Sequence, residues 1–128
     1  MKGIESRILL DSSAWLAYFL EESAEARDIF EKGKIIFTSI LSIFEIKRKL
    51  KRMKISDDKI SRAMAFIIHK SIVANLDLEI VDGATRISLE KKLAAIDSLI
   101  YSTSLLNNCV LVTGDSDFEG LDKVHVLE

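Results

Sequence analysis

The amino-acid sequence predicts an α/β domain: a short parallel sheet of four to five strands with helices on both faces, in three layers. Two observations support this fold class. Apolar runs of three or four residues alternate with longer stretches whose apolar residues recur at helical spacing. The runs contain few polar positions, which is typical of strands buried on both faces of a parallel sheet. The length of 128 residues predicts a single domain over residues 1–128.

The first 32 residues predict one strand and two helices. Residues 8–10 are an uncharged apolar run and form the expected first strand. Ser12 or Ser13 would cap a helix over residues 15–20, because a serine hydroxyl accepts from the free N–H groups of a first turn. Residues 21–32 are charged and amphipathic, which predicts a second helix.

A second strand and two long helices are expected next. Residues 35–38 are the second apolar run. Ser39 or Ser42 would cap a helix that continues to about Lys54. Ser56 would cap the following helix, whose first turn carries two aspartates that the helix dipole favours.

The rest of the chain predicts three more strands. Residues 78–81 are the expected third strand, followed by a helix capped by Asp82. Residues 96–106 predict an amphipathic helix, and two asparagines after it favour a turn. Residues 110–112 and 124–127 are the fourth and fifth expected strands.

Composition and charge exclude several classes of protein. The 18 Lys and Arg against 20 Asp and Glu give a net charge of −2, which excludes a histone-like protein that coats nucleic acid by bulk positive charge. One cysteine excludes a disulfide framework and a multi-cysteine zinc site. No leader or membrane span is recognisable, so we expect a cytoplasmic protein without membrane contact.

Several acids are expected at the carboxyl edge of the sheet, where parallel α/β sheets bind ligands. Asp11 directly follows the first strand, and Asp115 and Asp117 follow the fourth. Glu45, in the helix after the second strand, and Asp97, at the start of the helix before the fourth strand, are positioned to join them. Each acid alone also fits a structural role, as a helix cap, a turn residue or part of a helix ion pair.

The surroundings of Asp11 and Asp97 favour a ligand role over these structural ones. Both lie in apolar sequence, and a buried carboxylate is costly unless it is paired, hydrogen-bonded or bound to a cation. Clustered carboxylates repel one another, and a hard divalent cation relieves that repulsion. An all-oxygen site selects Mg²⁺ or Mn²⁺ over zinc, and such ions serve phosphodiester cleavage.

Four segments each join an acid to a predicted element. They are Leu9-Leu10-Asp11-Ser12-Ser13-Ala14-Trp15, Ser42-Ile43-Phe44-Glu45-Ile46, Ala95-Ile96-Asp97-Ser98-Leu99-Ile100 and Leu111-Val112-Thr113-Gly114-Asp115-Ser116-Asp117-Phe118. Their order and context resemble the motifs of the PIN domain family, most closely the VapC-type toxin ribonucleases of VapBC toxin–antitoxin pairs. The resemblance covers essentially the whole chain.

The resemblance implies a metal-dependent endoribonuclease. In it, one or two Mg²⁺ or Mn²⁺ ions would be bound by the catalytic quartet Asp11, Glu45, Asp97 and Asp115, with Asp117 supporting the loop or sharing the metal. Ser12 and Thr113 would hydrogen-bond the carboxylates or a metal-bound water. A metal-activated water would attack an RNA phosphodiester, leaving 5′-phosphate and 3′-hydroxyl ends. Implied partners are the RNA substrate, a cognate antitoxin protein and a second copy of the chain. Gly114 departs from the family pattern, which often has a larger, basic residue there.

Residues 47–54 form a basic stretch, with six Lys or Arg in eight positions and no acid. Lys49 and Arg52 share a helix face with Glu45, so cations would line the rim of the metal site. Such a stripe is suited to RNA phosphates. An ordinary solvated helix face is the simpler interpretation, and relatives use nearby helices to hold antitoxin.

Other functions remain open at this level. An RNA-processing or decay nuclease of the same fold would act without an antitoxin. An inactive binding domain and a phosphoryl-receiver signalling module belong to different classes. A receiver needs adjacent acids after its first strand, whereas two serines follow Asp11, and Asp82 is the single candidate phosphoacceptor. Trp15, Tyr18 and Phe19 are expected to pack in the core or a dimer rather than stack on bases.

Overall fold

Five parallel strands form one sheet in the computed structural model, which describes residues 6–31 and 33–128. The strand order is β3-β2-β1-β4-β5, and each neighbouring pair runs parallel. The strands are β1 (Arg7–Leu10), β2 (Ile35–Ser39), β3 (Ile72–Ala74), β4 (Val110–Thr113) and β5 (Val124–Val126). The order changes direction at β1, so β1 and β4 sit at the centre, where this fold class places its ligands.

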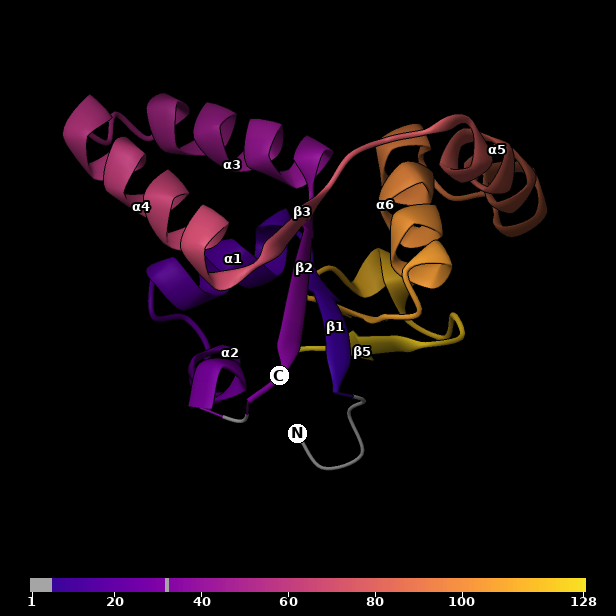
Figure 1. The fold of residues 1–128 in the computed structure, drawn as a ribbon, viewed down its shortest axis with the longest axis horizontal. Coiled ribbons are helices and arrows are strands. Elements are labelled where there is room, and N and C mark those ends of the chain that lie inside the picture. Colours follow the sequence, from indigo (N-terminus) through magenta and orange to yellow (C-terminus); the bar gives the residue numbers. More distant parts are fainter. Residues whose placement is uncertain (1–5, 32) are drawn as a thin grey trace.

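Helices cover both faces of the sheet, as Figure 1 shows. The helices are α1 (Ser12–Phe19), α2 (Ala24–Asp28), α3 (Ile40–Arg52), α4 (Asp57–Lys70), α5 (Leu78–Lys91) and α6 (Ala95–Leu106), with 3₁₀ turns η1 (Ile29–Glu31) and η2 (Ser116–Phe118). The first four helices lie on one side of the sheet and the last two on the other. None of the described helices is long and apolar enough to cross a membrane.

The two faces of the sheet belong to two separate cores. Ile8 and Leu10 of β1 pack with residues of α1, α3 and α4, whereas Leu9 packs with residues of α5 and α6. Successive side chains of a strand point to opposite faces, so an apolar run such as β1 supplies both cores at once. This confirms the expected three-layer fold and explains why the strand sequences contain few polar positions.

The expected third strand is wrong. Leu78 to Val81 begins α5, and the third strand lies earlier, at Ile72–Ala74. Asp77, not Asp82, caps the helix, because its carboxylate accepts from the backbone N–H of Ile80. Among residues 78–81, the first turn of α5, only Ile80 is buried, and Leu78 is 81% exposed. This is expected for a helix with one face toward the core. Asp82 therefore lies on a helix, which removes the candidate phosphoacceptor of a receiver module.

Two further boundaries differ from those expected, and a third settles a choice that the sequence left open. Asp11 caps α1 in place of Ser12 or Ser13. The helix expected over residues 21–32 is shorter, because Ser23 caps it and a 3₁₀ turn ends it; residue 32 lies outside the described residues. Ser39 is the cap of α3, and Ser42 is buried within it. A serine or aspartate can cap whichever turn its backbone permits, so sequence alone leaves neighbouring caps undecided.

Candidate metal centre

Acidic side chains from several elements meet at the carboxyl edge of the sheet. Oxygens of Asp97, Asp115 and Asp117 lie within 4.8 Å of one another. Asp97 stands in the first turn of α6, and the other two flank the start of η2, directly after β4. Asp11 directly follows β1 and Glu45 lies on α3, so both reach the same edge without belonging to this close set of three. The topology thus brings together acids that are more than a hundred residues apart in sequence.

Asp11 is the most buried of these acids, with 4% of its surface exposed. Its carboxylate accepts hydrogen bonds from the Thr113 hydroxyl at 2.5 Å, the Ser13 hydroxyl at 2.7 Å and the backbone N–H of Ala14 at 3.0 Å. Burial raises the pKa of Asp11, the three hydrogen bonds oppose the rise, and the nearby charge of Asp115 adds to it. Asp11 is therefore held in one orientation by both the helix it caps and the neighbouring strand.

Thr113 connects two of the acids. Its hydroxyl donates to Asp11 and accepts from the backbone N–H of Asp115 at 3.0 Å. Asp115 in turn accepts from the backbone N–H of Asp117 at 2.9 Å, so the loop after β4 is fixed residue by residue. Hydrogen bonds of this kind orient metal-ligating carboxylates in proteins.

Ser13, predicted from the sequence only as a possible helix cap, also belongs to the site. Besides Asp11, its hydroxyl contacts the Thr113 hydroxyl at 3.2 Å and accepts from the backbone N–H of Gly114 at 2.8 Å. It thereby joins the loops after β1 and β4. The sequence gives one signal of this role, which is the position of Ser13 two residues after Asp11. From there a serine hydroxyl can reach the carboxylate that caps the helix.

Glu45 reaches the edge from α3. It accepts from the Ser12 hydroxyl at 3.2 Å, which gives Ser12 the orienting contact expected of it. Burial raises the pKa of Glu45, the Ser12 hydrogen bond opposes this, and the charge of Asp11 raises it further. Glu45 and Asp11 therefore influence each other electrostatically although they lie on different elements.

Asp97 is repelled by each of the other four acids. Partial burial, followed by the charges of Asp115, Glu45, Asp11 and Asp117, raises its pKa to about 6. Its position in the first turn of a helix would by itself lower the pKa, so burial and the neighbouring carboxylates together outweigh the dipole. All four other acids thus act on one carboxylate.

This donor set fits a hard divalent cation. Three carboxylates converge within 4.8 Å, and each supplies only oxygen. Their mutual repulsion is the kind that a bound Mg²⁺ or Mn²⁺ removes. Among the described residues no histidine or cysteine joins this group, which disfavours zinc.

The raised pKa of Asp97 predicts how the stability of the metal-free protein depends on pH. Since the pKa of Asp97 in the folded protein is about 6 against 3.8 for a free side chain, the folded protein binds this proton more tightly than the unfolded chain. Without metal, the contribution of Asp97 therefore becomes more destabilising as pH rises from about 4 to about 6, and is constant above. In EDTA, the melting temperature of Asp97→Asn relative to wild type should rise over that interval and then level off. A difference independent of pH would contradict this.

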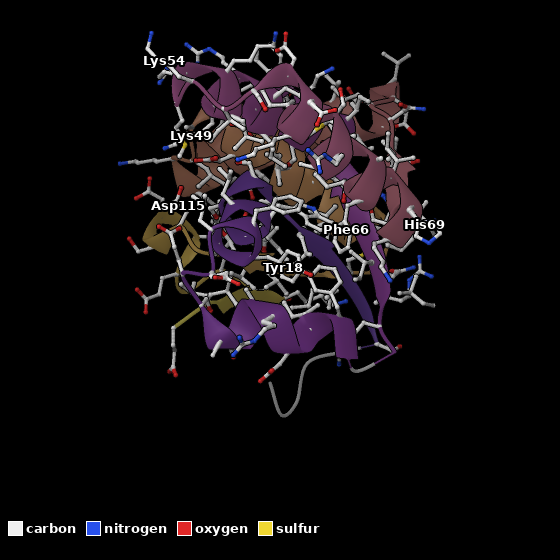
Figure 2. The ribbon with its side chains drawn as sticks, turned by 90° about the vertical axis from the view of Figure 1, so that its left-hand side faces the viewer. Tyr18, Lys49, Lys54, Phe66, His69 and Asp115 are labelled. Carbon is white, nitrogen blue, oxygen red and sulfur yellow. The ribbon has the colours of Figure 1, made fainter. Side chains whose placement is uncertain are left out.

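The basic stretch lies close to these acids along α3. Lys49 and Arg52 are exposed, and Figure 2 shows Lys49 and Asp115 toward the same edge of the molecule. Within this stretch only Lys51 makes an ion pair that the structure describes, with Asp57 at 3.3 Å. The remaining cations of α3 are therefore available to a ligand.

Comparison with known proteins connects this geometry to a family. The model of the PIN domain family matches residues 8–124. No curated protein sequence matches the chain significantly.

Solved structures share the fold at low identity. A toxin–antitoxin complex from Klebsiella pneumoniae has a TM-score of 0.77 at 21% identity, over 93% of this chain and 96% of that chain. DNA-bound VapBC from Salmonella typhimurium has a TM-score of 0.77 at 15% identity, over 94% and 96%. A sarcin-ricin loop cleaving VapC toxin from Mycobacterium tuberculosis has a TM-score of 0.74 at 18% identity, over 94% and 99%. At these identities the likeness shows the fold.

Proposed function

Because the chain belongs to the PIN domain family, we propose that it is a metal-dependent endoribonuclease, the toxin of a toxin–antitoxin pair. The observation that carries the proposal is the convergence of Asp97, Asp115 and Asp117 at the carboxyl edge of the sheet, beside the buried Asp11. The solved relatives named as toxin–antitoxin complexes support a toxin with an antitoxin partner over a processing or decay nuclease. The unit that acts is a single domain over residues 1–128.

We assign the metal to the carboxylates Asp11, Glu45, Asp97 and Asp115, with Asp117 as a further ligand. When bound, Mg²⁺ or Mn²⁺ supplies charge that activates a water and neutralises phosphate oxygens. The other side chains position these ligands: Thr113 and Ser13 hold Asp11, and Ser12 holds Glu45. The substrate phosphodiester would lie across the edge, between the acids and the cations of α3.

The outward face of α3 supports a single-stranded nucleic acid as substrate. Phe44 is 64% exposed, and it is the one aromatic residue in the described part of the chain with so open a ring. Lys47 and Arg48 follow it at the helical spacings that share its face. Proteins that bind single-stranded RNA combine cations that track the backbone with aromatic rings that stack on bases.

Cleavage of RNA tests the proposed activity directly. Purified protein should cut single-stranded RNA with Mg²⁺ or Mn²⁺ present, and EDTA should abolish the cleavage. The products should carry 5′-phosphate and 3′-hydroxyl ends, which distinguishes metal-assisted hydrolysis from attack by a ribose 2′-hydroxyl. Folded protein that cuts neither total RNA nor structured RNA with either metal would overturn the proposal.

Removing Lys49 and Arg52 should weaken RNA binding without changing its sequence preference. In an Asp97→Asn background, which prevents cleavage, the double change Lys49→Ala and Arg52→Ala should lower RNA affinity about tenfold. The logarithm of the RNA association constant should also fall less steeply with the logarithm of salt concentration, by about 1.4 in slope. The reason is that RNA binding releases fewer counterions once two phosphate contacts are lost. The control is Lys59→Ala with Lys123→Ala, two exposed cations outside α3. Equal effects of both pairs would refute the assigned RNA path.

A further inference from the structure

Three exposed apolar side chains border the acids of the candidate metal centre. Ile40 and Phe44 of α3 are 39% and 64% exposed, and Ile96 of α6 is 42% exposed. Phe44 immediately precedes Glu45, and Ile96 immediately precedes Asp97, so each adjoins an acid that we assign to the metal. A single exposed apolar residue is ordinary, but three beside one polar site indicate a ligand that has an apolar part.

Helices α3 and α6 bring these side chains to one place. The two helices lie on opposite faces of the sheet, as Figure 1 shows, and they contact each other. Ile40 and Phe44 are four residues apart and therefore lie on the same side of α3. Successive residues of a helix point about 100° apart, so the Phe44 ring lies to one side of the Glu45 carboxylate. It is therefore positioned to contact the part of a substrate that adjoins the reacting group.

The ring of Phe44 stands apart from the aromatic cluster of the core. That cluster joins α1, η1 and α4 through stacked and tilted ring pairs of Trp15, Tyr18, Phe19, Phe30 and Phe66. Among the described residues, Phe44 makes no ring pair and no cation–π contact. The ring is thus open to a flat partner from outside the chain.

Two cations follow the ring on the same face of α3. Lys47 and Arg48 are exposed, and neither makes an ion pair with another described residue. A single-stranded nucleic acid offers a flat base and a charged phosphate in every nucleotide, which matches a ring followed by cations. A protein segment would match the cations with acids, but it would give no reason for an aromatic ring directly beside a metal ligand.

We propose that Phe44 forms a base-binding subsite of the proposed nuclease, in which its ring stacks on the base next to the scissile phosphate. Lys47 and Arg48 then contact phosphates further along the strand, while Ile40 and Ile96 cover the edges of the base. This inference rests on the proposed function and narrows its substrate to RNA whose nucleotide beside the cut is unpaired. Stacking accepts every base, so the subsite fixes where the RNA is cut relative to the ring and not which base lies there.

Photochemical cross-linking tests the base contact without cleavage. The probe is a single-stranded uridine oligomer that carries 5-iodouridine, bound by the Asp97→Asn variant. Irradiation couples a halogenated base to an aromatic side chain stacked on it, and mass spectrometry of the peptides identifies that side chain. The cross-link should form at Phe44, and addition of Ile68→Ala, at a position 59% exposed on α4, should leave it unchanged. Bound RNA that cross-links only elsewhere, or folded protein that binds no RNA, would overturn the proposal.

An abasic nucleotide gives an independent test in the wild-type protein. Loss of the base beside the mapped cut should lower kcat/KM about tenfold, and Phe44→Ala should lower it by a similar factor on intact RNA. The two changes together should cost no more than either alone, because both remove the same contact. Phe44→Trp, which keeps an aromatic face, should retain the wild-type value. Losses that multiply to about a hundredfold would mean that the ring and the base act separately, and would overturn the subsite.

These outcomes are separate from the fate of the proposed nuclease activity. A cross-link at Phe44 in a protein that cuts no RNA would keep the base contact and refute the nuclease. Cleavage by wild type together with full activity of Phe44→Ala would keep the nuclease and overturn the subsite.

Discussion

Asp97→Asn should lower the rate of metal-dependent RNA cleavage about 1,000-fold and raise the melting temperature of the metal-free protein. The loss of rate corresponds to about 4 kcal/mol of transition-state stabilisation, the scale of a metal's contribution to charge neutralisation. The asparagine keeps the size of the side chain, so the metal loses a charged ligand while the surrounding contacts persist.

The gain in stability follows from the same carboxylate. Burial and four neighbouring acids raise the pKa of Asp97 to about 6, which means that its charge disfavours the folded protein at neutral pH. Asparagine removes that charge. One substitution therefore has opposite effects on activity and on stability, a combination that global misfolding cannot produce.

Asp28→Asn, on the exposed side of α2, is the matched control. It should leave both cleavage and melting temperature near wild type. In thermal melts, Mn²⁺ should stabilise wild type and the control more than Asp97→Asn. Cleavage by Asp97→Asn at the wild-type rate would remove Asp97 from the metal site, and a fall in its metal-free melting temperature would contradict the electrostatic explanation.

Trp15→Ala should cost about 4 kcal/mol of unfolding free energy, which is a large part of the stability of a small domain. Trp15 is fully buried, and its ring lies 5.8, 5.4 and 6.2 Å from the ring centroids of Phe19, Phe30 and Phe66. Its indole N–H donates to the Thr38 hydroxyl of β2 at 3.0 Å. Truncation thus leaves a cavity and removes the hydrogen bond between α1 and the sheet, while the Thr38 hydroxyl keeps its hydrogen bond with the Ser71 hydroxyl.

Two variants separate the causes of that loss. Trp15→Phe retains a ring and removes the donor, so it should cost about 1–2 kcal/mol from the lost hydrogen bond together with imperfect filling. Phe44→Ala, at an exposed ring, should change stability by less than about 0.5 kcal/mol. Urea unfolding measures all three. If Trp15→Ala were no more destabilising than Phe44→Ala, the aromatic cluster would not be part of the core.

The sheet was predictable from sequence because its strands are buried on both faces. Residues 8–10 of β1 and 110–112 of β4 have apolar side chains on successive positions, which is the pattern of a strand buried on both faces. Strand β3 could not be predicted in this way, because it has only three residues at the edge of the sheet and its Ile72 is exposed. The apolar run that follows it begins α5, and its Leu78 points outward instead of into the core, so the pattern was misleading.

The candidate site was predictable in its acids but not in its connections. Each acid lies after a strand or near the start of a helix, which indicates that it stands at the carboxyl edge of the sheet. Because the strands are parallel, all of these acids lie at the same edge. The close set of Asp97, Asp115 and Asp117, rather than the quartet, depends on the turn of η2 after Thr113. The contacts of Ser13 depend on two loops about a hundred residues apart, and no local pattern specifies their distance.

Asp11 belongs at once to the site and to the framework, since its carboxylate also caps α1. A descendant of this chain that had lost its enzymatic role would still need a hydrogen-bond acceptor at that position to begin its first helix. Asp97 has no such second use, and its charge opposes the metal-free fold. In inactive relatives we therefore expect the first acid to persist and the later one to be replaced, so that the residue equivalent to Asp97 reports activity more faithfully than the first aspartate.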